Sequence, residues 1–240
     1  MSLSLFAMSN QEVAQKNDAV MHGFKDSKSD MTMTLVNANG QKRERNMKML
    51  VFEKEGGDKS LMEFISPADV KGTKFLSYSH IKKNDDQWLY LPALKRVKRI
   101  ASKNKSGAFM GSEFSYEDLS SFDADKYSYS GDAKIVTLNG KKVYMGSRVP
   151  VTENSGYTKQ VSWTDTKTFL TQKVEYYDRT GELLKTATFE KYNKISGMWR
   201  IGQMSMVNHQ NDKSTTLEWK NEKIQTGLRE KSFHKRVLKK

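Results

Sequence analysis

The stretch from Met31 to Val51, MTMTLVNANGQKRERNMKMLV, decides what kind of secondary structure dominates this chain. Apolar side chains occupy every second position on both sides of its centre: Met31, Met33 and Leu35, then Met47, Met49 and Val51. Asn39-Gly40, which separates the two runs, is a dipeptide typical of tight hairpin turns. A period of two around such a turn predicts a pair of antiparallel β-strands with one apolar face.

The same pattern continues toward the end of the sequence. Further turn signals are Gly56-Gly57, Asn139-Gly140, Thr180-Gly181 and Asn211-Asp212. Runs rich in Thr, Val, Tyr, Phe and Trp lie at residues 134–138, 142–149, 159–163, 172–177, 185–192, 198–207 and 214–219. Pro67, Pro92 and Pro150 fall where strands are expected to end, because proline lacks a ladder donor. About ten or eleven antiparallel strands are predicted.

Three segments have helical signals. Ser9 and Glu12 have the spacing of a capping box that opens a helix, and Gly23 supplies its stop. A second possible capping box, Ser115 to Asp118, predicts a short helix through about Phe122. Residues 228–238 read as a basic, weakly amphipathic helical tail.

A sheet of this size would expose long edges, so it should curl into a barrel or half-barrel with the helices over its concave face. The predicted fold is mainly β, a large curled antiparallel sheet that forms an unclosed β-barrel with a helical lid over an apolar cavity. Residues 10–240 are expected to form one domain. The concave face is predicted to carry Met31, Met33, Leu35, Met47, Met49, Val51, Met62 and Phe64.

The methionines in that set have two readings. Methionine is flexible and polarizable, which suits a surface that accepts variable apolar shapes. It also serves as ordinary filler in cores. The sequence alone leaves both open.

Residues 102–122 are a candidate lid. Gly107 and Gly111 flank an apolar tip, and a short helix follows. The residues expected to close the cavity are Phe109, Met110, Phe114, Leu119 and Phe122. An ordinary surface loop with one helical turn is the alternative.

Catalysis finds little support in the sequence. The four histidines stand at no metal-ligand spacing, and no nucleophile elbow, Walker loop or His-Glu-x-x-His motif occurs. The absence of cysteine excludes disulfides, thiolate metal sites and a cysteine nucleophile. The chain is therefore predicted to be a non-enzyme that has no metal site and needs no cofactor.

The formal net charge of +13 would attract nucleic acid, anionic lipid headgroups or acidic proteins. A basic run contains Lys95, Arg96, Lys98 and Arg99. These four residues, termed the docking patch, would protect a sheet edge from aggregation or contact an anionic surface or acidic partner. Nucleic acid is disfavoured, because Trp88 and Tyr90 precede the charges instead of interleaving with them.

The first nine residues read like the end of a secretory signal. A short apolar run leads to small residues at Ala7 and Ser9, but a basic n-region is missing. A short apolar segment that packs on the fold is the alternative. Residues 1–9 are predicted to be a residual leader that is cleaved near Ser9 or Asn10.

Several motifs resemble the LolA-like "outer membrane lipoprotein-sorting" family. The most specific are WLYLPALKRVKRI at residues 88–100 and GSEFSYED at residues 111–118. Weaker ones are GDKSL (57–61), PADVKGT (67–73), SYSH (77–80), NSGY (154–157), VEYYD (174–178), MVNHQ (206–210) and KST (213–215). The resemblance covers the chain from about Gln11 to Leu238.

This resemblance implies an unclosed barrel of about eleven strands with a helical lid, in agreement with the strand pattern. It implies a carrier in the Gram-negative periplasm that binds lipoprotein acyl chains or other lipids and shuttles them toward the outer membrane. Its implied partners are an inner-membrane exporter of ABC or RND type, an outer-membrane acceptor and, transiently, a membrane surface, with the carrier itself a monomer. The competing hypothesis is a basic β-sheet interaction module that docks on an exporter or an anionic membrane without a bound ligand.

Overall fold

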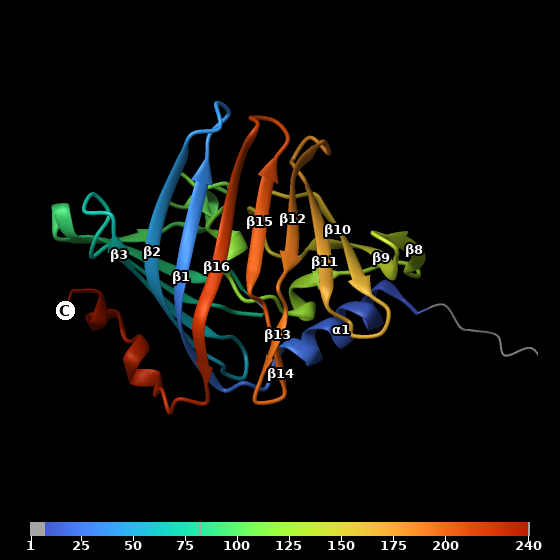
Figure 1. Ribbon diagram of the computed structural model, residues 1–240, viewed down its shortest axis with the longest axis horizontal. Coiled ribbons are helices and arrows are strands. Elements are labelled where there is room, and N and C mark those ends of the chain that lie inside the picture. Colours follow the sequence, from blue (N-terminus) through green and yellow to red (C-terminus); the bar gives the residue numbers. More distant parts are fainter. Residues whose placement is uncertain (1–7, 82, 240) are drawn as a thin grey trace, which may run out of the picture.

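The computed structural model describes residues 8–81 and 83–239, which form a curled antiparallel sheet (Figure 1). The strands are β1 (Asp26–Val36), β2 (Lys42–Phe52), β3 (Lys59–Ser66), β4 (Lys74–Tyr78), β5 (Asp86–Leu91), β6 (Arg96–Ile100), β7 (Tyr127–Ser128), β8 (Lys134–Leu138), β9 (Lys141–Pro150), β10 (Lys159–Asp165), β11 (Thr171–Tyr177), β12 (Leu183–Glu190), β13 (Asn193–Ile195), β14 (Met198–Arg200), β15 (Gln203–Asn208) and β16 (Lys213–Ile224). The single α-helix of the described residues, α1, spans Asn10–Met21. The leader predicted for residues 1–9 falls largely on residues 1–7, which lie outside the described residues.

The sheet is one continuous surface whose two ends do not pair, as predicted for an unclosed barrel. Its hydrogen-bonded order is β6-β5-β4-β3-β2-β1-β16-β15-β12-β11-β10-β9-β7, with β8 also paired to β9. β1 and β16 therefore join two meanders, one built from the first part of the chain and one from the last. The mainly β fold class is confirmed.

The strand count differs from the predicted ten or eleven, because this sheet has 14 strands within the described residues. Residues 198–207, predicted as one strand, form two: β14 pairs with β13 in a separate hairpin, and β15 returns to the main sheet. Gly202 stands at the break. A side chain there would meet the Lys191 carbonyl oxygen at 2.4 Å, so the backbone approach requires glycine.

The first helix forms as its capping residues predict. The Glu12 amide donates to Ser9 Oγ at 3.2 Å, and the Ser9 amide donates to Glu12 Oε2 at 2.8 Å. The Ser9 hydroxyl, which donates to Glu12 Oε2 at 2.7 Å, and the Ser9 amide together lower the pKa of the Glu12 carboxyl. Gly23 follows the helix with a φ of +98°, a conformation that favours glycine. α1 packs against β9 and β14 and so lies at one end of the curled sheet.

The inner face of the sheet carries the predicted methionines. Met31 of β1 pairs with Met47 of β2, which in turn pairs with Phe64 of β3. In the neighbouring row, Met49 pairs with Met62 and Met62 with Phe75. A period of two places these side chains on one side of four strands, β1 to β4, and gives one apolar surface.

The other two predicted helices are shorter than expected, and one lies on the unexpected side of the sheet. Only a 3-10 turn at Glu117–Leu119 follows Ser115, because the Ser115 hydroxyl lies 3.1 Å from the Tyr157 hydroxyl and does not cap the turn. The tail forms two 3-10 turns, Glu230–Phe233 and Lys235–Lys239. Their Phe233 and Leu238 pack on the outer face, so the tail does not cover the concave side.

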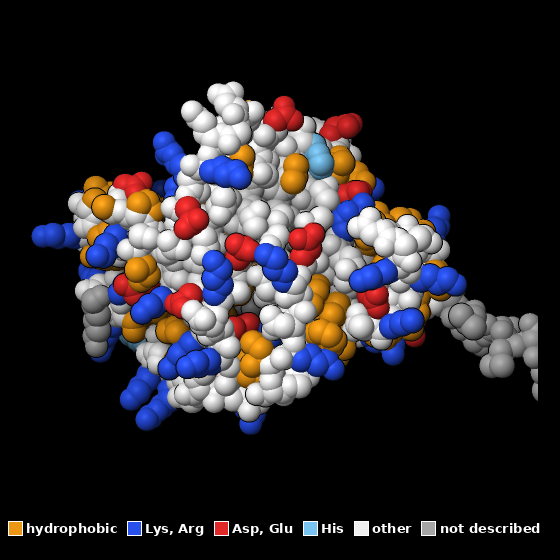
Figure 2. All heavy atoms as spheres, in the orientation of Figure 1, with side chains coloured by type: hydrophobic (Ala, Val, Ile, Leu, Met, Phe, Trp, Pro, Cys, Tyr) orange, Lys and Arg blue, Asp and Glu red, His pale blue; other side chains and the backbone are white. Residues whose placement is uncertain are grey.

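Within the described residues, no helix combines the length and the apolar character that crossing a membrane requires. On the face shown in Figure 2, lysines and arginines are scattered among acidic side chains and do not gather in one patch. The positive net charge is thus spread over this side of the molecule.

Candidate functional site

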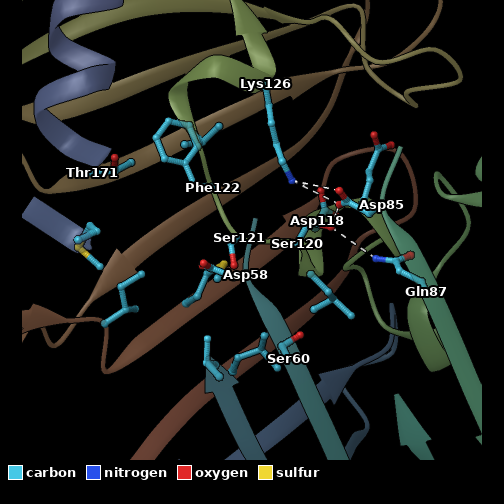
Figure 3. Close-up of a pocket in the computed structure, with 18 of the residues that line it drawn as sticks. Asp58, Ser60, Asp85, Gln87, Asp118, Ser120, Ser121, Phe122, Lys126 and Thr171 are labelled. Carbon is cyan, nitrogen blue, oxygen red and sulfur yellow. Dashed lines mark hydrogen bonds and ion pairs between the residues drawn. The ribbon is translucent and has the colours of Figure 1, made fainter. Parts of the chain in front are cut away.

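The inner face of the curled sheet encloses a cavity of about 360 Å³ (Figure 3). This volume lies in the range of small-molecule pockets in proteins. Strands from both meanders, α1 and the segment of residues 101–127 all contribute to its lining. The elements that enclose it therefore come from most of the chain.

One wall of the cavity is apolar. It is formed by side chains of β1 to β4 and of β12, β15 and β16: Met31, Met49, Val51, Met62, Phe75, Phe189, Met204, Leu217 and Trp219. A continuous apolar wall can bind a hydrocarbon chain without directional contacts.

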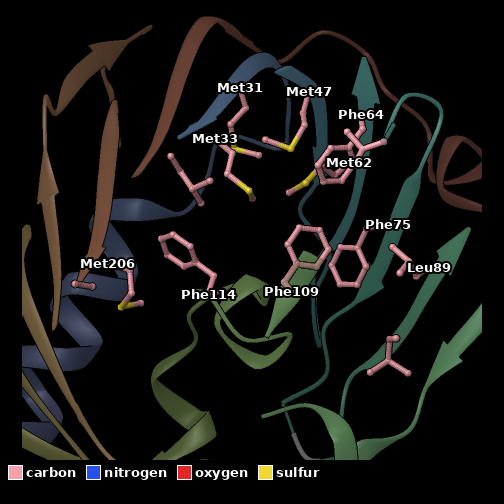
Figure 4. Packing of buried hydrophobic residues seen from close by; sticks show 14 of the residues in the cluster. Met31, Met33, Met47, Met62, Phe64, Phe75, Leu89, Phe109, Phe114 and Met206 are labelled. Carbon is pink, nitrogen blue, oxygen red and sulfur yellow. The ribbon is translucent and has the colours of Figure 1, made fainter. Parts of the chain in front are cut away.

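The eight residues predicted to bind lipid divide into two groups. Met31, Met49, Val51 and Met62 line the cavity. The other four, Met33, Leu35, Met47 and Phe64, belong to the same apolar cluster but not to the cavity lining. Figure 4 shows why, since Phe109 and Phe114 lie against this part of the inner face. The prediction that all eight bind lipid stays a prediction.

The segment predicted as a lid also contains both buried residues and residues that line the cavity. Phe109 and Phe114 are fully buried, and the ring of Phe109 lies 5.0 Å from that of Phe75. The Met110 carbonyl accepts a hydrogen bond from Arg45 at 2.6 Å. Leu119 and Phe122, by contrast, line the cavity. The first half of the segment is packed like a core, and the second half forms part of the cavity wall.

A buried ion pair holds this segment to the sheet. Lys185 of β12, 3% exposed, donates to Asp118 Oδ2 at 2.6 Å. Asp118 also accepts from the Tyr157 hydroxyl at 2.7 Å and from the Ser115 amide at 2.6 Å. Burial, together with the Asp118 and Glu117 carboxylates, raises the pKa of the Tyr157 hydroxyl well above its usual value. The sequence interpretation, which placed Asp118 only in a possible capping box with Ser115, missed this role.

A polar cluster lies at another part of the cavity. Lys126 Nζ lies 2.5 Å from Ser79 Oγ and 3.3 Å from Asp85 Oδ1, as Figure 3 shows for the ion pair. Asp85 also accepts a hydrogen bond from Ser120. Gln87 donates to the Tyr116 carbonyl at 2.8 Å. No sequence motif could have found this cluster, because its members come from separate strands and loops.

The docking patch lies apart from the cavity. Lys95, Arg96, Lys98 and Arg99 are exposed, on the edge strand β6 and the turn before it, and none of them lines the cavity. Arg99 also forms an ion pair with Asp86 at 2.5 Å, which lowers the pKa of that carboxyl. Both interpretations of the patch, edge protection and docking, remain compatible with this position.

Among the histidines, His22 borders the cavity. Its Nδ1 lies 3.0 Å from Asp18 Oδ1, and its Nε2 lies 3.9 Å from Asp58 Oδ2. The hydrogen bond to Asp18, aided by the charges of both carboxylates, raises the pKa of His22 to about 9. Residues 8–81 and 83–239 contain no cluster of three or more His, Cys, Asp or Glu side chains that could hold a metal ion.

Solved structures resemble this chain over nearly its whole length. One from Vibrio parahaemolyticus, assigned as an outer membrane lipoprotein-sorting protein domain, is 49% identical with a TM-score of 0.90, and the match covers 96% of this chain and 98% of that one. The chain belongs to the LolA-like outer membrane lipoprotein-sorting family.

Other matches agree with this assignment. A DUF1329 family protein from Desulfovibrio piger is 32% identical with a TM-score of 0.87, covering 95% of this chain and 97% of that one. The LolA superfamily protein NE2245 from Nitrosomonas europaea, at 18% identity and a TM-score of 0.77, shares the fold over 96% of this chain and 100% of its own length. A family model described as an uncharacterized protein matches residues 56–240. No curated protein sequence matches the chain. In this LolA-like protein, the cavity on the inner face is the candidate functional site.

Proposed function

We propose that this LolA-like protein is a non-enzymatic carrier that binds the acyl chain of a lipid or lipoprotein in its inner cavity. The observation that carries the proposal is the methionine-rich apolar wall, formed by strands that meet only in the curled sheet. The relative assigned to lipoprotein sorting supports the same function. The carrier is proposed to act as a single domain in the Gram-negative periplasm, between an inner-membrane exporter and an outer-membrane acceptor.

The energetics explain why such a carrier is needed. Each methylene buried in a membrane contributes ~0.8 kcal/mol, so an acyl chain of about 15 methylenes is held by ~12 kcal/mol. Spontaneous transfer through water is correspondingly slow. A protein cavity that replaces membrane contacts with Met, Phe and Leu contacts removes most of this barrier.

The direct test is ligand binding by purified protein. Native mass spectrometry of protein purified from cells should show bound lipid mass, and delipidated protein should take up a neutral fluorescent acyl probe. Ser60 lines the cavity from β3, so Ser60→Phe should fill part of it and weaken probe binding. Ile65→Phe, on the outward side of the same strand and 37% exposed, is the matched control and should bind like the native chain.

The alternative function is an interaction module that docks through its basic edge and holds no ligand. The exposure of Lys95, Arg96, Lys98 and Arg99 on the edge strand favours it. Replacing all four with Gln should then abolish binding to anionic vesicles. Protein that repeatedly purifies empty and takes up no acyl probe, yet binds vesicles through these residues, would favour the module over the carrier.

A further inference from the structure

Arg148 is a buried cation on the wall of the cavity. It extends from β9, is 9% exposed and belongs to the cavity lining. Its Nε donates to Oε1 of Gln160, its register partner on β10, at 2.8 Å. The guanidinium carbon lies 4.5 Å from the ring centres of both Phe122 and Tyr127. Two aromatic rings and one amide thus hold the guanidinium in place.

Arg148 has no carboxylate partner, unlike three other cations around the cavity, Lys126, Lys185 and Arg200. Lys126 pairs with Asp85 at 3.3 Å, and Lys185 with Asp118 at 2.6 Å. Arg200 pairs with Glu222 at 2.7 Å. In the part of the chain that the structure describes, no carboxylate lies within ion-pair distance of Arg148, and its two terminal amino groups have no hydrogen-bond acceptor. Burying an unpaired charge is costly, so such a group is retained where an anion completes it.

The carboxylates of the lining are already engaged elsewhere. Asp85, Asp118 and Glu222 hold the three cations above. Asp58 accepts a hydrogen bond from the Lys54 amide at 3.2 Å and lies 3.9 Å from His22 Nε2. Glu117 accepts hydrogen bonds from the Gly156 amide at 2.7 Å and from Ser155 Oγ at 2.9 Å. Burial and the neighbouring Asp118 raise the pKa of the Glu117 carboxyl, which weakens it further as a counterion. The fork of the Arg148 guanidinium remains available to a ligand.

A second cation of the same lining is also without a carboxylate partner. Lys105 Nζ donates to Thr152 Oγ1 at 2.7 Å and to Asn84 Oδ1 at 3.0 Å. Within residues 8–81 and 83–239, no carboxylate lies within ion-pair distance of it. The polar part of the cavity therefore offers two cations that are held only by neutral groups.

The register joins this polar part to the apolar wall. Arg148, Gln160 and Tyr176 lie side by side on β9, β10 and β11, and Val174 is the next inward residue of β11. Val174 and Tyr176 line the same cavity as Met204 and Leu217. A single ligand can therefore contact the guanidinium at one end and hydrocarbon at the other.

We propose that the cavity selects amphiphiles with an anionic headgroup, a carboxylate or a phosphate, which the Arg148 guanidinium binds while the acyl tail lies along the methionine wall. This inference rests on the proposed carrier function and specifies its cargo. Arginine suits the role because its planar fork donates two parallel hydrogen bonds to either anion.

The test compares ligands that differ only in the headgroup. Delipidated full-length protein is titrated with palmitate or with hexadecanol, each displacing a neutral fluorescent acyl probe. The native chain should prefer palmitate. Arg148→Gln should weaken palmitate binding by about tenfold to 100-fold, the range expected for a lost charge-assisted hydrogen bond, and leave hexadecanol within about twofold. Arg148→Lys should recover part of the preference, because it keeps the charge without the fork.

Controls separate the possible outcomes. Lys98→Gln, which makes the same charge change on the exposed edge strand, should leave both ligands unaffected. Lysophosphatidic acid and inorganic phosphate, titrated separately, distinguish a phosphate headgroup from free phosphate. Circular dichroism and thermal unfolding check that each variant is folded. If Arg148→Gln and Arg148→Lys both keep the native ratio of palmitate to hexadecanol affinity, the headgroup inference is wrong and the carrier function stands. If the native chain binds neither ligand, both are wrong.

Discussion

Strands β3, β4 and β5 carry two apolar faces that differ in composition and in how they are covered. On the outer face, Leu61, Leu76 and Trp88 pack against Phe233 and Leu238 of the tail. That cluster contains no methionine among the described residues, whereas the inner cluster buries Met31, Met33, Met47, Met62 and Met206. Leucine and aromatic side chains thus form the outer face, which the tail covers, whereas the flexible methionines lie on the inner face, mainly on β1 and β2 beside Met62 of β3.

The inner face repeats this contrast on a smaller scale. Phe109 and Phe114 fill one part of it, and the cavity occupies the other. The methionine-rich surface is thus partly a packed core and partly a cavity wall, so residue type alone does not distinguish the two parts. The segment of residues 101–127, anchored by the Asp118–Lys185 ion pair, decides which part of the inner face is filled and which part stays open.

Breaking the Asp118–Lys185 ion pair should cause the largest loss of stability. Asp118→Ala leaves the charge of Lys185 buried without its partner and should lower the free energy of unfolding by about 3–5 kcal/mol. Urea unfolding followed by circular dichroism measures the change. Glu218→Ala, which removes the partner of the exposed Lys191, is the control and should cost about 1 kcal/mol or less. Equal losses in the two variants would mean that the Asp118–Lys185 pair does not anchor the segment.

The second-largest loss of stability is expected from removing a buried side chain of the outer cluster. Leu238 is fully buried, and Leu238→Ala should cost about 3 kcal/mol through lost burial and the cavity left behind. Affinity for a neutral acyl probe, measured on the folded fraction, should not change, because this residue lies on the face opposite the cavity. Ile135→Ala, at a side chain that is 51% exposed, should be nearly neutral for stability. A loss of probe affinity in Leu238→Ala would show that the two faces are coupled.

Replacing inner methionines by leucine, and outer leucines by methionine, tests whether the residue type of each face matters for binding. The triple variant Met31→Leu, Met49→Leu and Met62→Leu nearly conserves volume, so each change should cost less than about 1.5 kcal/mol. The branched side chains should, however, narrow the range of acyl-chain lengths that the cavity accepts, measured by competition with a probe. The reverse exchange on the outer face, Leu61→Met with Leu76→Met, should leave that range unchanged. An identical range in the inner triple variant would make its methionines ordinary filler.

The smallest expected effect concerns His22, which borders the cavity beside α1. Its pKa of about 9 lies above the ordinary 6.5, so the protonated form is favoured in the folded state. The stabilisation is complete below the ordinary pKa and is lost as pH rises through about 9. An NMR titration of the His22 ring in the native chain should give a midpoint near pH 9. Asp18→Asn should move the His22 titration toward neutral pH, and an unchanged midpoint would exclude Asp18 as the cause.

The sequence predicted much of the fold because its signals are local. Alternation around Asn39-Gly40 predicted β1 and β2 with the correct inner face, and Ser9 with Glu12 predicted the start of α1. The prediction was wrong where distant contacts outweigh local pattern. Ser115 has capping spacing but lies beside the Tyr157 hydroxyl, and the tail has helical spacing but follows the outer surface in short turns.

The candidate site was predictable only in its apolar part. Period-two spacing identified Met31, Met49, Val51 and Met62, which do line the cavity. The charged part was missed, because Asp118 and Lys185 are 67 positions apart and Arg148 has no local motif. Such residues acquire their chemistry from burial and from neighbours, which a single sequence does not reveal.

The pairing of β1 with β16 has a consequence for how the chain is made. Ser27 pairs with Ile224 and Val36 with Ser214, so the central ladder of the sheet joins segments at opposite ends of the sequence. During synthesis the first meander emerges long before its central partner, with the hydrogen-bonding edge of β1 unsatisfied. Ladders of such long sequence separation form slowly, and unpaired edges invite association with other chains. Newly made chains should therefore depend on protection of the β1 edge until β16 has paired with it.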